Sequence, residues 1–279
     1  MKTINQEKAI KFQLRQCLLT IFVLFAVNLL LLDSAQAQIR PYTPRSFSTV
    51  PPDPDGAEFY FARLIYGTGN FRGRGGWTVD MPEAEHYFMN GITRLTEVDG
   101  SLVNMSNMEG SQLINLEDRN IFDYPFLYAV EVGGWSLNTE EIAILREYLL
   151  KGGFLIVDDF HGSYEWSGFM ATMQRIFPDR PVVDIPHDDE VFQVVYQLDP
   201  TIQIPGISPL SRGVTWERDG RDPTYRGIYD DRGRLMVAIN HNMDLGDAWE
   251  HADTPGYPQS LTAMAYRFAV NYVIYSLTH

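Results

Sequence analysis

The sequence predicts an α/β fold, a three-layer sandwich in which helices cover both faces of a mostly parallel central sheet. Amphipathic helical segments alternate with short apolar segments along the chain, which is the pattern of strand–helix–strand units. Residues 154–157 are continuously apolar, as expected for a strand covered on both faces. The 279 residues, 45% hydrophobic and 21% charged, have the length and composition of one large globular domain.

Each element has its own local signal. Strands are predicted at residues 58–66, 113–116, 125–132, 154–157 and 182–185, and a hairpin over residues 227–239 turns at 231–233. A helix is predicted to open with a capping box of Asp80 and Glu83, and another with Asn138 and Glu141, ending at Gly152. Further helices are expected at residues 166–177 and 259–277, with a polar loop over 240–258 between the hairpin and the last helix.

The N-terminus predicts export. Residues 1–37 combine a basic start, an uncharged stretch from 17 to 32 and the small-x-small pattern Ala35-Gln36-Ala37, which is typical of a cleaved signal peptide. The alternative is an uncleaved membrane anchor. Residues 38–56 then form a Pro-rich linker, and residues 57–279 form the α/β domain. We therefore expect a periplasmic or extracellular protein, attached to a membrane only if the N-terminal segment stays uncleaved.

Charge and cysteine content exclude two function classes. The net charge of −14 disfavours binding to nucleic acid. The only cysteine, Cys17, lies in the predicted signal peptide, so the mature chain has no thiol nucleophile.

The end of the strand at 154–157 is the first candidate site, with Asp158, Asp159 and His161 as candidate catalytic residues. Ligands of open α/β sheets bind beyond the carboxyl ends of the strands. One of the two adjacent carboxylates is expected to face this crevice and the other a helix N-terminus. The pair could act as a general base or as metal ligands. The alternative is a structural carboxylate capping the chain from Ser163, with His161 exposed.

Other candidate ligand-binding residues follow strands or flank the first glycine-rich loop. If the strand at 182–185 is parallel, His187 joins the same edge and a shared metal is possible. Aromatic rings mixed with polar groups suit a polyhydroxylated ligand, although Trp249 could equally fill the core. Arg63 could bind an anion, or be buried and paired with Asp80 or Glu85. The candidate ligand-binding residues are Arg63, Trp77, Asp80, Glu85, Trp166, His187, Asn240, His241, Asp247, Trp249 and Glu250.

Five separated motifs resemble one bacterial family, DUF4159, a domain of unknown function. They are FARLxY at 61–66, GGWxxDxPxxE at 75–85, YPFLY at 124–128, GGFLxxDD at 152–159 and NHNxDLGDAWE at 240–250. The resemblance covers residues 58–279 and implies a flavodoxin-like sandwich related to the class I glutamine amidotransferase-like fold. Amidotransferases carry a cysteine nucleophile, whereas Asp158 and Asp159 stand at the corresponding position here. Cysteine-dependent glutaminase activity is therefore excluded.

Two functions are consistent with these patterns. The first is a non-catalytic binding or assembly module of the cell envelope, whose crevice holds a carbohydrate-like or acidic small ligand, or which binds a cell-envelope protein. The second is a hydrolase-like enzyme that uses the Asp and His residues, with or without a metal. The sequence indicates no particular cofactor and leaves the presence of a metal open.

Overall fold

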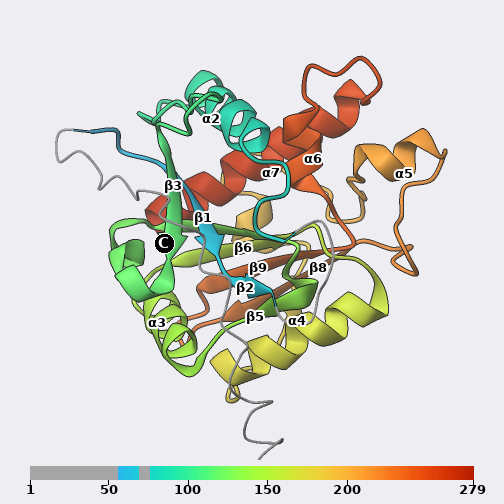
Figure 1. Ribbon diagram of the computed structural model, residues 1–279. Helices are drawn as coiled ribbons and strands as arrows, with labels where there is room; N and C mark the ends of the chain where they lie inside the picture. Colours follow the sequence, from blue (N-terminus) through green and yellow to red (C-terminus); the bar gives the residue numbers. More distant parts are fainter. Residues whose placement is uncertain (1–55, 69–75) are drawn as a thin grey trace, which may run out of the picture. The chain divides into compact units, whose positions relative to one another are not determined.

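The computed structural model describes residues 56–68 and 76–279 (Figure 1). The predicted signal peptide, nearly all of the Pro-rich linker and residues 69–75 of the glycine-rich loop lie outside this range. The strands of the main sheet are β1 (Phe61–Ile65), β3 (Ser111–Asn115), β4 (Phe126–Val130), β6 (Phe154–Asp158), β7 (Val183–Asp184), β8 (Thr224–Tyr229) and β9 (Leu235–His241). Two further strands, β2 (Gly67–Thr68) and β5 (Trp135–Ser136), pair with each other in an antiparallel ladder.

The main sheet is parallel over most of its width. Its strand order is β3-β1-β4-β6-β9-β8-β7, and the strands from β3 to β9 pair in parallel. The last two pairings, β9 with β8 and β8 with β7, are antiparallel. Numbered by their order in the chain, the parallel strands follow 2-1-3-4-5, which is the flavodoxin-like order. The predicted fold class is confirmed.

Helices cover both faces of this sheet (Figure 1). One layer contains α2 (Glu83–Leu95), α6 (Leu245–Glu250) and α7 (Gln259–Thr278), which contact one another. The opposite layer contains α3 (Thr139–Leu150) and α4 (Gly162–Ile176). The remaining helical turns are α5 (Ile207–Ser211), η1 (Leu116–Asp118), η2 (Asn120–Asp123), η3 (Val132–Gly134) and η4 (Glu190–Phe192). None of the helices in the described ranges has the length and hydropathy needed to span a membrane.

The two cores are built from alternate residues of the same strands. In β6, Phe154 and Ile156 pack on the α2, α6 and α7 side, whereas Leu155 and Val157 pack on the α3 and α4 side. All four side chains are buried, because successive side chains of a strand point to opposite faces. The same alternation directs Asp158 toward α6 at the carboxyl end of the strand.

The capping box predicted for α3 is confirmed. The Asn138 side chain accepts hydrogen bonds from the backbone N–H groups of Glu140 and Glu141, and the Glu141 carboxylate accepts from the Asn138 N–H at 2.6 Å. We expect Asn138→Ala to lower the free energy of unfolding by about 1 kcal/mol, because it leaves N–H groups of the first turn without acceptors. Urea unfolding measures this effect. Asn138→Asp should retain most of the stability, and equal stability of the alanine variant would contradict the assignment.

Three local predictions were wrong. Asp80 does not cap α2, whose first turn has no side-chain cap, because the Asp80 side chain turns toward α6 instead. The helix predicted from residue 166 begins at Gly162. The polar loop predicted at 240–258 contains the short helix α6, capped by Asp244, which accepts from the Asp247 N–H at 2.8 Å.

Candidate functional site

Acidic side chains converge at the carboxyl edge of the parallel sheet. Asp159 follows β6, Asp244 follows β9, and Asp80 comes from the segment between β2 and α2. One carboxylate oxygen from each of these three residues lies within 4.8 Å of the other two. Asp159 and Asp244 are buried, and Asp80 is partly buried. We call Asp80, Asp159 and Asp244 the carboxylate triad.

The two adjacent aspartates after β6 have different surroundings. The Asp158 Oδ2 atom accepts hydrogen bonds from the Leu245 and Gly246 N–H groups at 2.8 and 3.0 Å, so Asp158 anchors the N-terminus of α6. Tyr128 donates its hydroxyl to the same oxygen at 3.0 Å. Asp159 instead adopts a left-handed backbone conformation with φ of 49°, and its side chain joins the triad. The alternation predicted for this pair is therefore present.

Burial and mutual repulsion act on all three triad carboxyls. Burial raises the pKa of Asp80, Asp159 and Asp244 well above the usual range. Neighbouring carboxylates raise these pKa values further: Asp247 acts on Asp80, Glu131 on Asp159, and Asp159 on Asp244. The fold thus disfavours the ionised form of all three carboxyls as long as no cation neutralises them.

Arg63 lies close to the triad but is already neutralised. It is fully buried, and its Nε–H pairs with Glu85, which is also fully buried. Its Nη1 group donates to the backbone carbonyls of Trp77 and Val79 at 3.1 and 2.9 Å. Arg63 lowers the pKa of Asp80, but this effect is smaller than those of burial and of Asp247. Arg63 therefore does not offset the burial and repulsion that raise the pKa of Asp80.

His161 is the neutral neighbour of the triad. Its Nε2 atom lies 3.0 Å from Asp159 Oδ1, and the residue is only 5% exposed. Burial lowers the pKa of His161 to about 3, so the ring is neutral near pH 7. The Nδ1 atom has no hydrogen-bond partner. The alternative of an exposed His161 is wrong, and Ser163 is capped by Asp219 rather than by Asp158 or Asp159.

Backbone strain concentrates at the same edge. Seven non-glycine residues in the described ranges have φ between 49° and 65°. Five of these seven belong to the triad or the loops around it, namely Asp80, Glu131, Asp159, Arg218 and Asn242. Left-handed conformations of non-glycine residues are uncommon and gather at functional sites, because the surrounding structure must hold them in place. Their clustering makes this edge the candidate functional site.

Of the other predicted charged residues, four lie near the triad and one, His187, does not. Asp247 and Glu250 lie at the rim of the triad on α6, where they and His251 offer three ligand atoms within 4.8 Å. Arg63 and Glu85 lie beneath it. His187 is exposed beyond β7, and β9 and β8 separate β7 from β6, a distance of about 14 Å at normal strand spacing. Among the described residues, His187 belongs to neither of the two groups of possible metal ligands, so the expected metal shared with Asp159 is not supported.

The predicted aromatic and amide residues serve packing. Trp249 is fully buried, with its ring 4.8 Å from that of Phe88, and Trp77 is also buried. The Trp166 ring contacts the ring of His241 at a tilt of 43°, and the Arg226 guanidinium lies 4.6 Å from the Trp166 ring centre. The Asn240 Oδ1 atom accepts from the Tyr272 hydroxyl at 2.7 Å. These positions favour a structural role for Trp77, Trp166, Asn240 and Trp249.

Asp244 and Glu131 were missed as candidate residues. Asp244 belongs to one of the family motifs. Because the sequence does not predict α6, it does not predict that Asp244 caps this helix and belongs to the triad. Glu131 directly follows β4, and burial and repulsion by Glu165 raise its pKa to about 7. Glu131 lies inside the strand predicted at residues 125–132, and Asp244 lies beyond the hairpin predicted to end at residue 239, so neither position follows a predicted strand directly.

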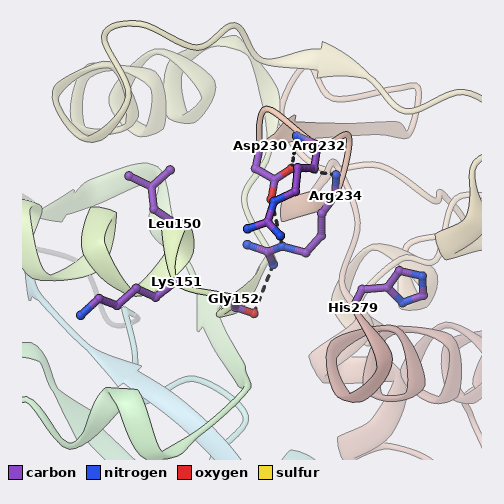
Figure 2. A pocket seen from close by; sticks show the side chains of 7 residues that line it. All are labelled: Leu150, Lys151, Gly152, Asp230, Arg232, Arg234 and His279. Carbon is purple, nitrogen blue, oxygen red and sulfur yellow. Dashed lines mark hydrogen bonds and ion pairs between the residues drawn. The ribbon is translucent and has the colours of Figure 1, made fainter.

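A pocket of about 430 Å³ lies at the opposite edge of the sheet, before β6 and β9 (Figure 2). One of the basic side chains that line this pocket is that of Arg234. Arg234 donates to the carbonyls of Leu149, Gly152 and Gly153 and pairs with Asp230. Arg234 thus closes the end of α3, and this pocket is not the candidate site.

The free energy of unfolding is expected to fall as the pH rises from about 4.5 to about 7 in buffer with EDTA. Burial raises the pKa of Asp158 to about 6 and, together with Glu165, that of Glu131 to about 7. A group with a raised pKa stabilises the fold below its unfolded pKa, and this contribution is lost as the pH rises through the folded value. The expected decrease is on the order of 2–4 kcal/mol by urea unfolding. In Asp158→Asn, the free energy of unfolding should depend less on pH. A wild-type free energy of unfolding that rises over this pH range would contradict the prediction.

Fold and site together define a flavodoxin-like α/β protein with a cluster of carboxylates at the carboxyl edge of its sheet. The chain belongs to the DUF4159 family, a domain of unknown function, whose sequence pattern matches residues 60–277. No curated protein matches the chain.

Proposed function

We propose that this protein is an exported, non-catalytic binding module of the cell envelope, whose crevice holds a positively charged ligand. The observation that carries the proposal is the carboxylate triad, with three acidic oxygens within 4.8 Å of one another. Burying like charges together is unfavourable unless a cation or protons neutralise them. A cationic ligand would relieve this repulsion between the carboxylates. The relief would contribute to the free energy of binding.

The same charge disfavours two of the ligand classes expected from the sequence. An acidic ligand would be repelled by the triad together with Asp247 and Glu250. A carbohydrate would need open aromatic faces, but arginine guanidinium groups cover one face each of Trp166 and Trp216, at 4.6 and 4.7 Å. The other candidate aromatics, Trp77 and Trp249, are buried. A cationic group is the ligand class that fits.

A thermal-shift screen tests this proposal. The purified protein, dialysed against EDTA and then against chelator-free buffer, is mixed with calcium, magnesium, manganese or spermidine as cationic probes. Phosphate serves as the anionic probe and maltotriose as the neutral one. At least one cationic probe should raise the Tm of the wild type, and Asp159→Asn and Asp244→Asn should abolish that shift.

Asp188→Asn is the matched control, because it removes the same charge from an exposed position beyond β7. It should respond like the wild type. A shift with phosphate or maltotriose alone, or a cation-induced shift that survives in both triad variants, would overturn the proposal. Export is tested separately: mature protein recovered from the periplasm or medium should begin at Gln38.

The buried Asp159–His161 pair favours a hydrolase as the second candidate function. Asp159 would orient the neutral ring, and the unpartnered Nδ1 atom could accept a proton from water. Assays with p-nitrophenyl phosphate and p-nitrophenyl acetate test this function. Turnover that is lost in His161→Gln but kept in His187→Gln would support the enzyme over the binding module.

A further inference from the structure

We infer that the carboxylate triad is the binding site of one divalent metal ion of the oxygen-preferring class, calcium, magnesium or manganese. The inference rests on the proposed function and names the cation that the crevice would bind. Three steps lead to it: the spacing of the oxygens, the unpartnered oxygens at the site, and the way each carboxylate is held.

The spacing suits one ion. Metal–oxygen distances are about 2.0–2.1 Å for magnesium and about 2.3–2.6 Å for calcium, so ligands on opposite sides of one ion are about 4–5 Å apart. The triad oxygens lie within 4.8 Å of one another, so a single ion between them could contact all three. The oxygens come from three separate segments of the chain. An ion bound by all three would therefore cross-link these segments at the edge of the sheet.

Two buried oxygens at this place have no hydrogen-bond donor. Asp80 Oδ2 is buried and unpartnered, and it rests against Gly246, where any side chain would collide with it. Asp158 is completely buried and its Oδ1 atom is also unpartnered. Asp158 lies beside the triad, because the same Gly246 donates its N–H to Asp158 Oδ2. Buried carboxylate oxygens without donors are rare, and a bound cation would supply the missing partner.

The other triad carboxylates are already oriented. Asp159 Oδ1 faces His161 Nε2 at 3.0 Å, and Asp244 Oδ1 accepts the Asp247 N–H at 2.8 Å. One oxygen of each carboxylate is thereby fixed in position. Hydrogen bonds of this kind orient metal-binding side chains and are part of most metal sites.

The donor set indicates the class of metal. All three ligands are carboxylates, which suit calcium, magnesium and manganese rather than the softer metals. The nearest histidine nitrogen, His161 Nε2, is used by Asp159. A double charge also balances three carboxylates better than the single charge of one ammonium group. Asp247 and Glu250 at the rim would raise the local cation concentration.

Isothermal titration of the metal-free protein with calcium, magnesium and manganese chloride tests the inference. The expected result is one ion per chain, with a dissociation constant on the order of 1 mM or lower. Terbium gives a second readout, because Tyr128 and Trp249 lie near the triad and would sensitise its luminescence. Asp159→Asn and Asp244→Asn should weaken binding roughly tenfold or more. Asp188→Asn should leave the affinity unchanged.

His251→Ala separates the triad from the neighbouring group of Asp247, Glu250 and His251. Binding that is lost in His251→Ala but kept in Asp159→Asn would place the ion on α6 and overturn the inference. If spermidine shifts the Tm but no divalent ion binds, the inference fails and the proposed function stands. If no cationic probe binds, both fail. Circular dichroism identifies a variant that misfolds. The number of ions bound per wild-type chain tests the inference without any variant.

Discussion

Arg63→Met is expected to destabilise the protein by about 3–5 kcal/mol, because it leaves the Glu85 carboxylate charged, buried and without its partner. Both side chains of this pair are completely buried. The substitution also removes the donors of the Trp77 and Val79 carbonyls, which position the segment leading to Asp80. Urea unfolding at neutral pH gives the change in free energy.

The double variant Arg63→Met/Glu85→Leu is the control for this prediction. It removes both charges, so it should recover a large part of the loss, because an uncompensated buried charge costs more than the absence of the pair. The two carbonyls remain without their donors, and recovery should therefore be incomplete. A single variant that loses less than about 1 kcal/mol would mean that Glu85 is neutralised in another way.

Asp244→Asn is expected to stabilise the protein by about 1–3 kcal/mol at about pH 8 in EDTA. Burial, Asp159 and Asp247 all raise the pKa of Asp244, so its ionised form is disfavoured in the folded state. The asparagine amide oxygen can still accept the Asp247 N–H, and the cap of α6 is retained. At about pH 4 the gain should vanish, because the wild-type carboxyl then holds its proton in the folded state.

Adding calcium should reverse the order of stability, because only the wild type gains from binding the ion. Urea unfolding at both pH values, with EDTA and with calcium, measures all four conditions. Asp188→Asn should follow the wild type throughout. If Asp244→Asn were less stable than the wild type at about pH 8 in EDTA, Asp244 would be a structural residue and not a member of a strained acidic site.

The sequence predicts the layers of this fold better than the details of its site. Continuous apolar strands and capped helices are local signals, and for α3 the capping box and the Gly152 stop predict both ends. The different directions of Asp158 and Asp159 follow from strand alternation alone. The helix that Asp158 anchors is α6, however, whose Leu245 lies 87 residues further along the chain. Local pattern contains no information about that contact.

The wrong predictions share this cause. Asp80 has the residue type and spacing of a helix cap, but its side chain rests against Gly246 of α6. His187 follows a predicted strand, but the number of strands between β6 and β7 is a property of the whole sheet. The six residues of α6 are too few to show a helical period in a polar loop. Tertiary contacts decided each of these positions.

The position of β9 has a consequence for when the molecule can fold. Residues 235–241 form a strand inside the sheet, between β6 and β8, although they follow both of these strands in the chain. Before β9 has been translated, β6 has an open edge, and β7 and β8 have no strand that joins them to the sheet. Contacts between distant segments form slowly, and unpaired edges aggregate. The complete sheet can therefore form only after β9 has been translated.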